Sequence, residues 1–228
     1  MLRDLLEAFT KDSLMSTILN EFALMMEDAR WMFESVGHTL IDGVDPQQYR
    51  QQLYERDIRI NKAERSIRKK IIEHLTLSPA KDLGSCLVLF SAAKDAERLG
   101  DYCKNLSELA ALLHGRPYPQ RFAPRIGHLH GAIGALFTST ALAMSEARTE
   151  HATTVMETAR KLSRDCDQLL VEILDGPDDQ DAKAAVATAM TARYLKRVAG
   201  HISNIASGVV NPVHKIDFFL EDETPSES

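Results

Sequence analysis

The sequence predicts an all-α fold made of two tandem three-helix bundles. Its composition favours helices, because aromatic residues make up only 6% and Gly (11) and Pro (8) are few among 228 residues. Apolar residues also recur every three or four positions through six long stretches, as on one face of a helix. Finally, the order long helix, long helix, proline turn, long helix occurs twice, which indicates an internal repeat.

The first half of the chain is predicted to hold three helices, at residues 13–40, 46–77 and 81–113. The first has an apolar face, which consists of Leu14, Ile18, Phe22, Met25, Met26, Ala29, Met32, Phe33, Val36 and Leu40. Ser78-Pro79 separates the second helix from the third, because the residue before a proline avoids helical ψ. The third begins with an unbroken apolar run at residues 87–90, so its first half is expected to be deeply buried.

The strongest break in the sequence lies at residues 114–119, followed by Pro124. Gly115 can cap the preceding helix, and the prolines prevent its continuation. We therefore expect a hinge here, with a first repeat at residues 1–115, a second repeat at 116–211, and a C-terminal extension with an acidic tail at 212–228.

The second half is predicted to repeat the pattern with helices at residues 124–146, 150–174 and 180–210. Residues 126–145 contain no Asp, Glu, Lys or Arg, and a helix of that length could span a bilayer. The same stretch contains His128, His130, three glycines and four hydroxyl residues. A helix buried between protein neighbours is therefore the prediction.

Composition also argues against several classes of protein. The net charge is −6 and the pI about 5.8, so there is no overall basic field to attract nucleic acid. Cys86, Cys103 and Cys166 form no Cys-x-x-Cys pair, which favours buried thiols in a reducing compartment over a disulfide framework or a zinc site. Charged residues interrupt the first twelve positions, so no secretion signal is predicted and a cytoplasmic location is expected.

The internal repeat can be aligned residue by residue. With an offset of 99, residues 93–105 overlay residues 192–204. Arg98 then coincides with Arg197 and Asn105 with Asn204, and the surrounding apolar or small positions match. Long helices joined by short links pack as antiparallel bundles.

Residues 94–106, Lys-Asp-Ala-Glu-Arg-Leu-Gly-Asp-Tyr-Cys-Lys-Asn-Leu, resemble the Glu/Asp-x-x-x-Asp signature of the PhoU family. Residues 194–205 resemble the same signature with its acids missing. The resemblance implies two PhoU-type bundles in a cytoplasmic negative regulator of phosphate uptake that is not an enzyme. It further implies contacts with the ATPase of the phosphate ABC transporter and with a phosphate sensor kinase, a homodimer, and metal ions or clusters on the acidic surface.

Glu97 and Asp101 lie one helical turn apart, so their carboxylates share a face. Asp57 and Asn61 supply a candidate opposite row on the preceding helix, which Glu64 extends. These oxygen ligands suit hard metals. Together with the metal binding that the resemblance implies, this pattern predicts a metal site at Glu97, Asp101, Asp57 and Asn61 for iron, manganese, zinc or magnesium, in the first repeat only.

The alternative for these acids is a solvated charged surface, in which they pair with Lys94, Arg98 or Lys104. In the second repeat, Lys196 and Gly200 replace both acids, so no metal is expected there.

Three functional hypotheses follow: a regulatory adaptor, a carboxylate-bundle metal protein or metalloenzyme, and a purely structural dimer. No glutamate has a histidine three residues later, which argues against a ferritin-like di-iron enzyme. No phosphate-binding loop or nucleophile elbow is present, so any ATPase is expected to be a partner. Residues 209–217 depart from the PhoU pattern and predict a helix stop at Asn211-Pro212 followed by a docked extension. This departure and the altered second repeat leave open that the chain is a PhoU-like paralogue that serves another phosphate transporter.

Overall fold

The computed structural model describes residues 14–77, 82–113, 118, 121–176 and 181–216, and these residues form helices and connecting turns without a strand. The long helices are α2 (Leu14–Leu40), α3 (Gln47–Leu77), α4 (Leu83–Leu113), α5 (Ala123–Glu146), α6 (Thr149–Leu174) and α7 (Ala182–Val210). A short 3₁₀ helix, η1 (Val213–Lys215), follows. The predicted all-α fold is confirmed, and the helix boundaries agree with the predicted ones to within about two residues.

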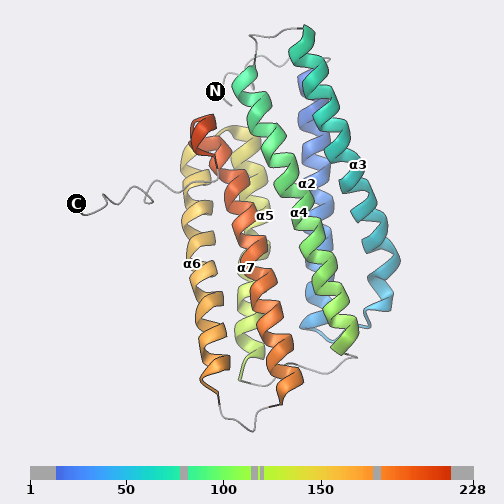
Figure 1. Cartoon of the computed structure of the whole chain (residues 1–228), viewed down its shortest axis with the longest axis vertical. Coiled ribbons are helices and arrows are strands. Elements are labelled where there is room, and N and C mark those ends of the chain that lie inside the picture. The colour runs from blue at the N-terminus through green and yellow to red at the C-terminus, as the bar shows by residue number, and fades with distance from the viewer. Residues whose placement is uncertain (1–13, 78–81, 114–117, 119–120, 177–180, 217–228) are drawn as a thin grey trace, which may run out of the picture.

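The helices form two antiparallel three-helix bundles that lie side by side (Figure 1). The first bundle consists of α2, α3 and α4, and the second of α5, α6 and α7. The bundles join through α4 against α7 and through α2 against α5. This arrangement confirms the tandem bundles, whereas the division of the chain at residues 115 and 116 stays a prediction.

The helix ends follow from local sequence where they are described. The Asp181 side chain caps α7 by accepting hydrogen bonds from the backbone N–H groups of Lys183 and Ala184, at 2.9 and 3.4 Å. α7 ends at Val210 before Asn211-Pro212, as predicted, and η1 packs against α4. The predicted breaks at residues 78–79, 114–117 and 177–178 lie outside the described residues.

One hydrophobic core runs through both bundles. The predicted apolar face of α2 is buried in it except at its two ends, where Leu14 and Leu40 are partly buried, and the methionines at positions 15, 25, 26 and 32 fill the core. The three cysteines are buried free thiols. α5 buries Ile126, Leu129 and Phe137 against protein neighbours. Among the described residues, no helix is long and apolar enough to cross a membrane.

The bundles meet at two positions where glycine permits a close approach. A Cβ atom on Gly37 of α2 would lie 2.3 Å from the ring of His130 on α5, and one on Gly208 of α7 would lie 2.6 Å from Val88 on α4. The His130 ring stacks on Phe33 at 4.2 Å, and its Nε2 lies 2.9 Å from the Phe33 carbonyl oxygen. Burial lowers the pKa of His130, so the neutral ring is favoured in this contact.

We predict that Gly37→Ala destabilises the fold by about 1–3 kcal/mol, because the added methyl group would overlap the His130 ring in a packed contact. Chemical denaturation of the variant measures this loss. Gly131→Ala on α5 is the matched control, since a Cβ there meets no atom within 4 Å. Equal stability of the two variants would contradict the proposed packing constraint.

Candidate functional site

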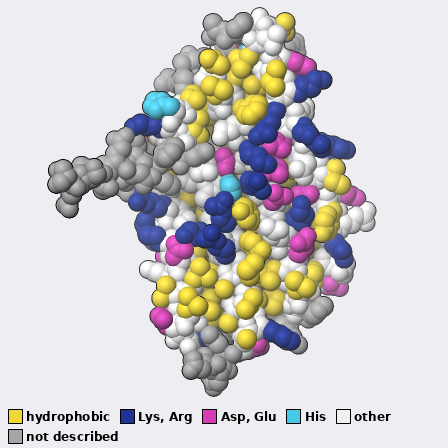
Figure 2. All heavy atoms as spheres, viewed as in Figure 1, with side chains coloured by type: hydrophobic (Ala, Val, Ile, Leu, Met, Phe, Trp, Pro, Cys, Tyr) yellow, Lys and Arg dark blue, Asp and Glu magenta, His cyan; other side chains and the backbone are white. Residues whose placement is uncertain are grey.

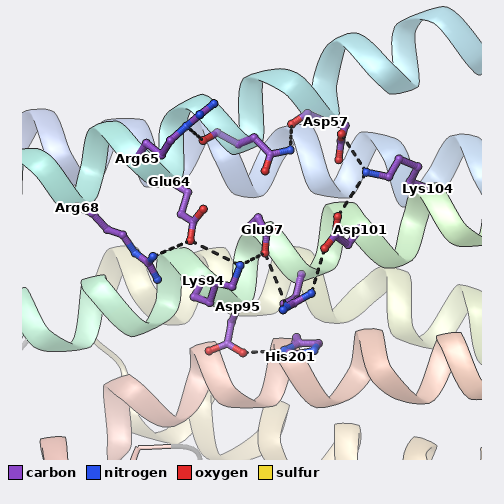
Figure 3. Close-up of polar contacts among 12 residues, drawn as sticks. Asp57, Glu64, Arg65, Arg68, Lys94, Asp95, Glu97, Asp101, Lys104 and His201 are labelled. Carbon is purple, nitrogen blue, oxygen red and sulfur yellow. Dashed lines mark hydrogen bonds and ion pairs between the residues drawn. The ribbon is translucent and has the colours of Figure 1, made fainter.

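The predicted site residues come together along the line where α3 and α4 pack against each other, which we call the acidic seam. α4 places Glu97 and Asp101 on the side that faces α3, and α3 places Asp57 opposite them (Figure 3). Asn61 lies one turn after Asp57 on α3. The helical period explains this placement, because residues four apart on each helix share a face.

A lysine ammonium lies between two of these carboxylates. Lys104 Nζ is 3.1 Å from Asp57 Oδ2 and 3.4 Å from Asp101 Oδ1. Burial disfavours the charged ammonium, but the hydrogen bond that Lys104 donates to Asp57 and the charges of Asp57 and Asp101 outweigh this effect, and the pKa of Lys104 is raised. The lysine therefore stays protonated and ties α3 to α4.

The other end of the seam contains two further buried carboxylates. Lys94 Nζ lies 2.7 Å from Glu97 Oε2 and 3.8 Å from Glu64 Oε1, and it bridges the two helices. Arg68 pairs with Glu64 at 3.1 Å, and Arg98 lies 3.8 Å from Glu97. Glu64 is thus a full member of the acidic seam, although the predicted metal site did not include it.

Asn61 lies in the seam but hydrogen-bonds within its own helix. Its Nδ2 donates to the backbone oxygen of Asp57 at 2.9 Å, and Arg65 Nε donates to the backbone oxygen of Asn61 at 3.1 Å. The amide therefore stabilises α3 locally, in contrast to the carboxylates, which bridge the two helices.

The arrangement of the seam bears on the predicted metal. Protein cations contact each of its four carboxylates, and Arg98 also pairs with Asp101 at 3.2 Å. Across the described residues, no group of three or more His, Cys, Asp or Glu side chains is placed to hold one metal ion. In this geometry the carboxylates pair with lysine and arginine side chains, and a metal ion would have to displace these side chains. Metal binding stays a prediction.

A second polar cluster lies on the opposite side of α4, where α4 meets α7. Asp95 Oδ1 is 2.7 Å from His201 Nδ1 and accepts a hydrogen bond from Asn204 Nδ2 at 3.1 Å. The His201 ring stacks on Tyr102 with centroids 5.6 Å apart, and Arg197 Nε donates to the Tyr102 hydroxyl at 3.0 Å. This cluster joins the two bundles by polar contacts.

Sequence reasoning did not identify this cluster as a site. Asp95 and His201 are 106 positions apart, so no local motif connects them. The available signal was the repeat itself, because Asn204 is the counterpart of Asn105 in the aligned segment. That signal identifies a repeated position without revealing its contact across the bundles.

The corresponding line between α6 and α7 in the second repeat has a different charge pattern. Lys196 takes the place of Glu97, and its Nζ lies 2.5 and 2.7 Å from the two carboxylate oxygens of Asp167. Gly200 takes the place of Asp101. Both acids are therefore absent from this line, as predicted. The Lys196–Asp167 pair lies where the first repeat has the pair of Glu97 and Lys94.

We predict that Lys104→Met destabilises the protein by about 1–3 kcal/mol, because the largely buried Asp57 carboxylate would lose its cation. Adding Asp57→Asn should recover most of the loss, and denaturant unfolding measures both. Lys69→Met is the control, since its side chain is 78% exposed and should change stability by less than about 0.5 kcal/mol. An unchanged unfolding midpoint for Lys104→Met would show that this bridge contributes nothing to stability.

Comparison with known proteins identifies the fold. Residues 22–110 match the PhoU domain. The crystal structure of PhoU from Pseudomonas aeruginosa is similar with a TM-score of 0.80 at 20% identity, over 88% of this chain and 97% of that chain. The phosphate transport system regulatory protein PhoU from Streptococcus pneumoniae gives a TM-score of 0.73 at 17% identity, over 92% and 95%. No curated protein sequence matches. Residues 22–110 thus contain a PhoU domain, and most of the chain shares its fold with these PhoU crystal structures.

Proposed function

We propose that this chain is a cytoplasmic regulator of phosphate uptake that acts by binding other proteins and catalyses no reaction. The observation that carries the proposal is the PhoU domain within a fold that matches a phosphate transport system regulatory protein over 92% of the chain. The proposed partners are the ATPase of a phosphate ABC transporter, or another phosphate transporter, and a phosphate sensor kinase. We also propose that the chain forms a homodimer.

The end of the first bundle has a surface suited to protein contacts. Four large apolar side chains are exposed where α3 ends and α4 begins: Ile72 (60%), Leu77 (81%), Leu83 (47%) and Leu87 (43%). The predicted deep burial of the first half of α4 is therefore wrong for Leu83 and Leu87. Hydrophobic side chains gather at this upper end of the molecule (Figure 2). Grouped exposed apolar side chains of this kind mark interaction surfaces in soluble proteins. We propose that this end, the apolar tip, contacts the transporter component.

The regulatory proposal predicts that cells lacking the chain take up phosphate without restraint when phosphate is abundant. Uptake of labelled phosphate measures this, and the native chain should restore the restraint. A Leu77→Ser/Leu83→Ser variant should fold normally and fail to restore it, whereas Leu24→Ser, at a side chain 63% exposed on α2, should act as the native chain does. Unchanged uptake in cells without the chain would contradict the proposed function.

The alternative proposal is a metal-binding carboxylate protein or metalloenzyme, and it depends on the acidic seam. The observation in its favour is that α3 and α4 contribute four carboxylates to one seam, three of which are largely buried. Carboxylates bind hard cations, and a metal ion in the seam would neutralise the carboxylates in place of the lysine and arginine side chains.

The metal proposal predicts that metal copurifies with the full chain and is lost in a Glu97→Ala/Asp101→Ala variant of unchanged helicity. Elemental analysis of protein prepared without chelator or a histidine tag measures this. Glu150→Ala/Glu157→Ala on α6 removes the same charge from exposed positions and should retain the metal. If no sample contains metal after reconstitution with iron, manganese, zinc or magnesium, the acidic seam is a structural or protein-binding feature.

A further inference from the structure

The line where α6 packs against α7, which we call the basic seam, is the counterpart of the acidic seam in the second repeat. Under the offset of 99, Arg193 and Arg197 of α7 match Lys94 and Arg98 of α4, so these two cations are kept, whereas Lys104 corresponds to Ser203. The two carboxylates are not kept, since Lys196 and Gly200 stand where Glu97 and Asp101 stand in the first repeat. On α7, the basic seam has therefore kept two of the three cations and lost both anions.

α6 adds further positive charge to this line. Asp167 pairs with Lys196, which places Asp167 at the seam. Arg164 and Arg160 lie one and two turns before Asp167 on the same face of α6. The next acid on this face, Glu157, lies a further turn away. Apart from Arg160, the seam thus carries four Lys and Arg side chains, Arg164, Arg193, Lys196 and Arg197, and its described ion pair is that of Lys196 with the carboxylate of Asp167.

The excess positive charge is only partly satisfied within the protein. Arg197 Nε donates to the Tyr102 hydroxyl, and a guanidinium nitrogen of Arg197 lies 3.4 Å from His201 Nε2, so neither of these two partners is a carboxylate. Arg164 and Arg193 are exposed and form no ion pair or hydrogen bond with any of the residues described. Lys and Arg side chains gather at mid-height over α6 and α7 (Figure 2).

Gly200 leaves open space within this group of cations. A Cβ atom built on Gly200 would meet no atom within 4 Å. Gly200 lies one turn after Lys196 on α7, and Arg164 lies one turn before Asp167 on α6. Because α6 and α7 run antiparallel and Lys196 pairs with Asp167, Gly200 lies across from Arg164. At the matching place in the first repeat, the Asp101 carboxylate lies 3.2 Å from Arg98 and 3.4 Å from Lys104.

We propose that the basic seam at Gly200 binds a tetrahedral oxyanion of the phosphate class, which takes the place of the carboxylate present in the first repeat. Guanidinium groups donate two parallel hydrogen bonds to such an anion, and the Lys196 ammonium adds a point charge. Arg164 and Lys196 are the central ligands, and Arg193 and Arg197 extend the positive field along α7. The site depends on the charges of this seam alone and does not require the regulatory role proposed above.

Titration of sodium phosphate into the full chain by calorimetry, at constant ionic strength, tests the proposal. We expect saturable binding, with sulfate competing and chloride not competing. Gly200→Asp should restore the carboxylate of the first repeat and weaken binding by tenfold or more, whereas the nearly isosteric, neutral Gly200→Asn should retain it. The expected tenfold change corresponds to about 1.4 kcal/mol.

A second pair of variants separates the site from general surface charge. Arg164→Gln/Arg193→Gln should weaken phosphate binding about tenfold without loss of stability, because neither arginine pairs with another residue in the described part of the chain. Lys62→Gln/Lys69→Gln removes the same charge from exposed positions on α3 and should leave binding unchanged. The proposal is overturned if binding is not saturable, if chloride competes equally, or if Gly200→Asp and Gly200→Asn bind phosphate with the same affinity.

Discussion

The close approach of the two bundles is the constraint on which the rest of the structure depends. Gly37 against His130 and Gly208 against Val88 bring α2 to α5 and α4 to α7 at distances that a methyl group would obstruct. Close packing of this kind lets a single core run through both bundles, and dense packing leaves little freedom for the helices to slide. The seams on either side of this junction are therefore held on one rigid frame.

α4 and α7 are the central helices of this frame, and each has two polar faces with different partners. α4 contributes Glu97 and Asp101 to the acidic seam and Asp95 to the contact with α7. α7 contributes Lys196 to the basic seam, and its His201 meets Asp95 at 2.7 Å. The Asp95–His201 contact therefore lies between the two seams. The acidic seam lies on the α3 side of the α4–α7 contact, and the basic seam lies on its α6 side.

The internal repeat gives a physical account of the different charges of the two seams. Two copies of one helical pattern need apolar side chains at the same core positions to pack, and Leu99 and Val198 are both fully buried at matching positions. Core packing sets no such requirement on the charges along the seams. One seam balances its cations with its own carboxylates, and the other has an excess of cations. This difference is the basis for assigning the two seams separate roles.

The sequence alone determined the helices, the repeat and the resemblance of the first repeat to the PhoU domain, because apolar periodicity and turn residues act locally and the Glu97-x-x-x-Asp101 pattern lies within one helix. It also placed Asp57 and Glu97 correctly on facing helices. It did not determine which cation satisfies each acid, since Lys104 bridges to Asp57 across 47 positions. The Asp95–His201 contact and the Gly37–His130 approach likewise depend on how two bundles meet. Only the tertiary structure decided these contacts, because they arise from helix packing between segments that share no local pattern.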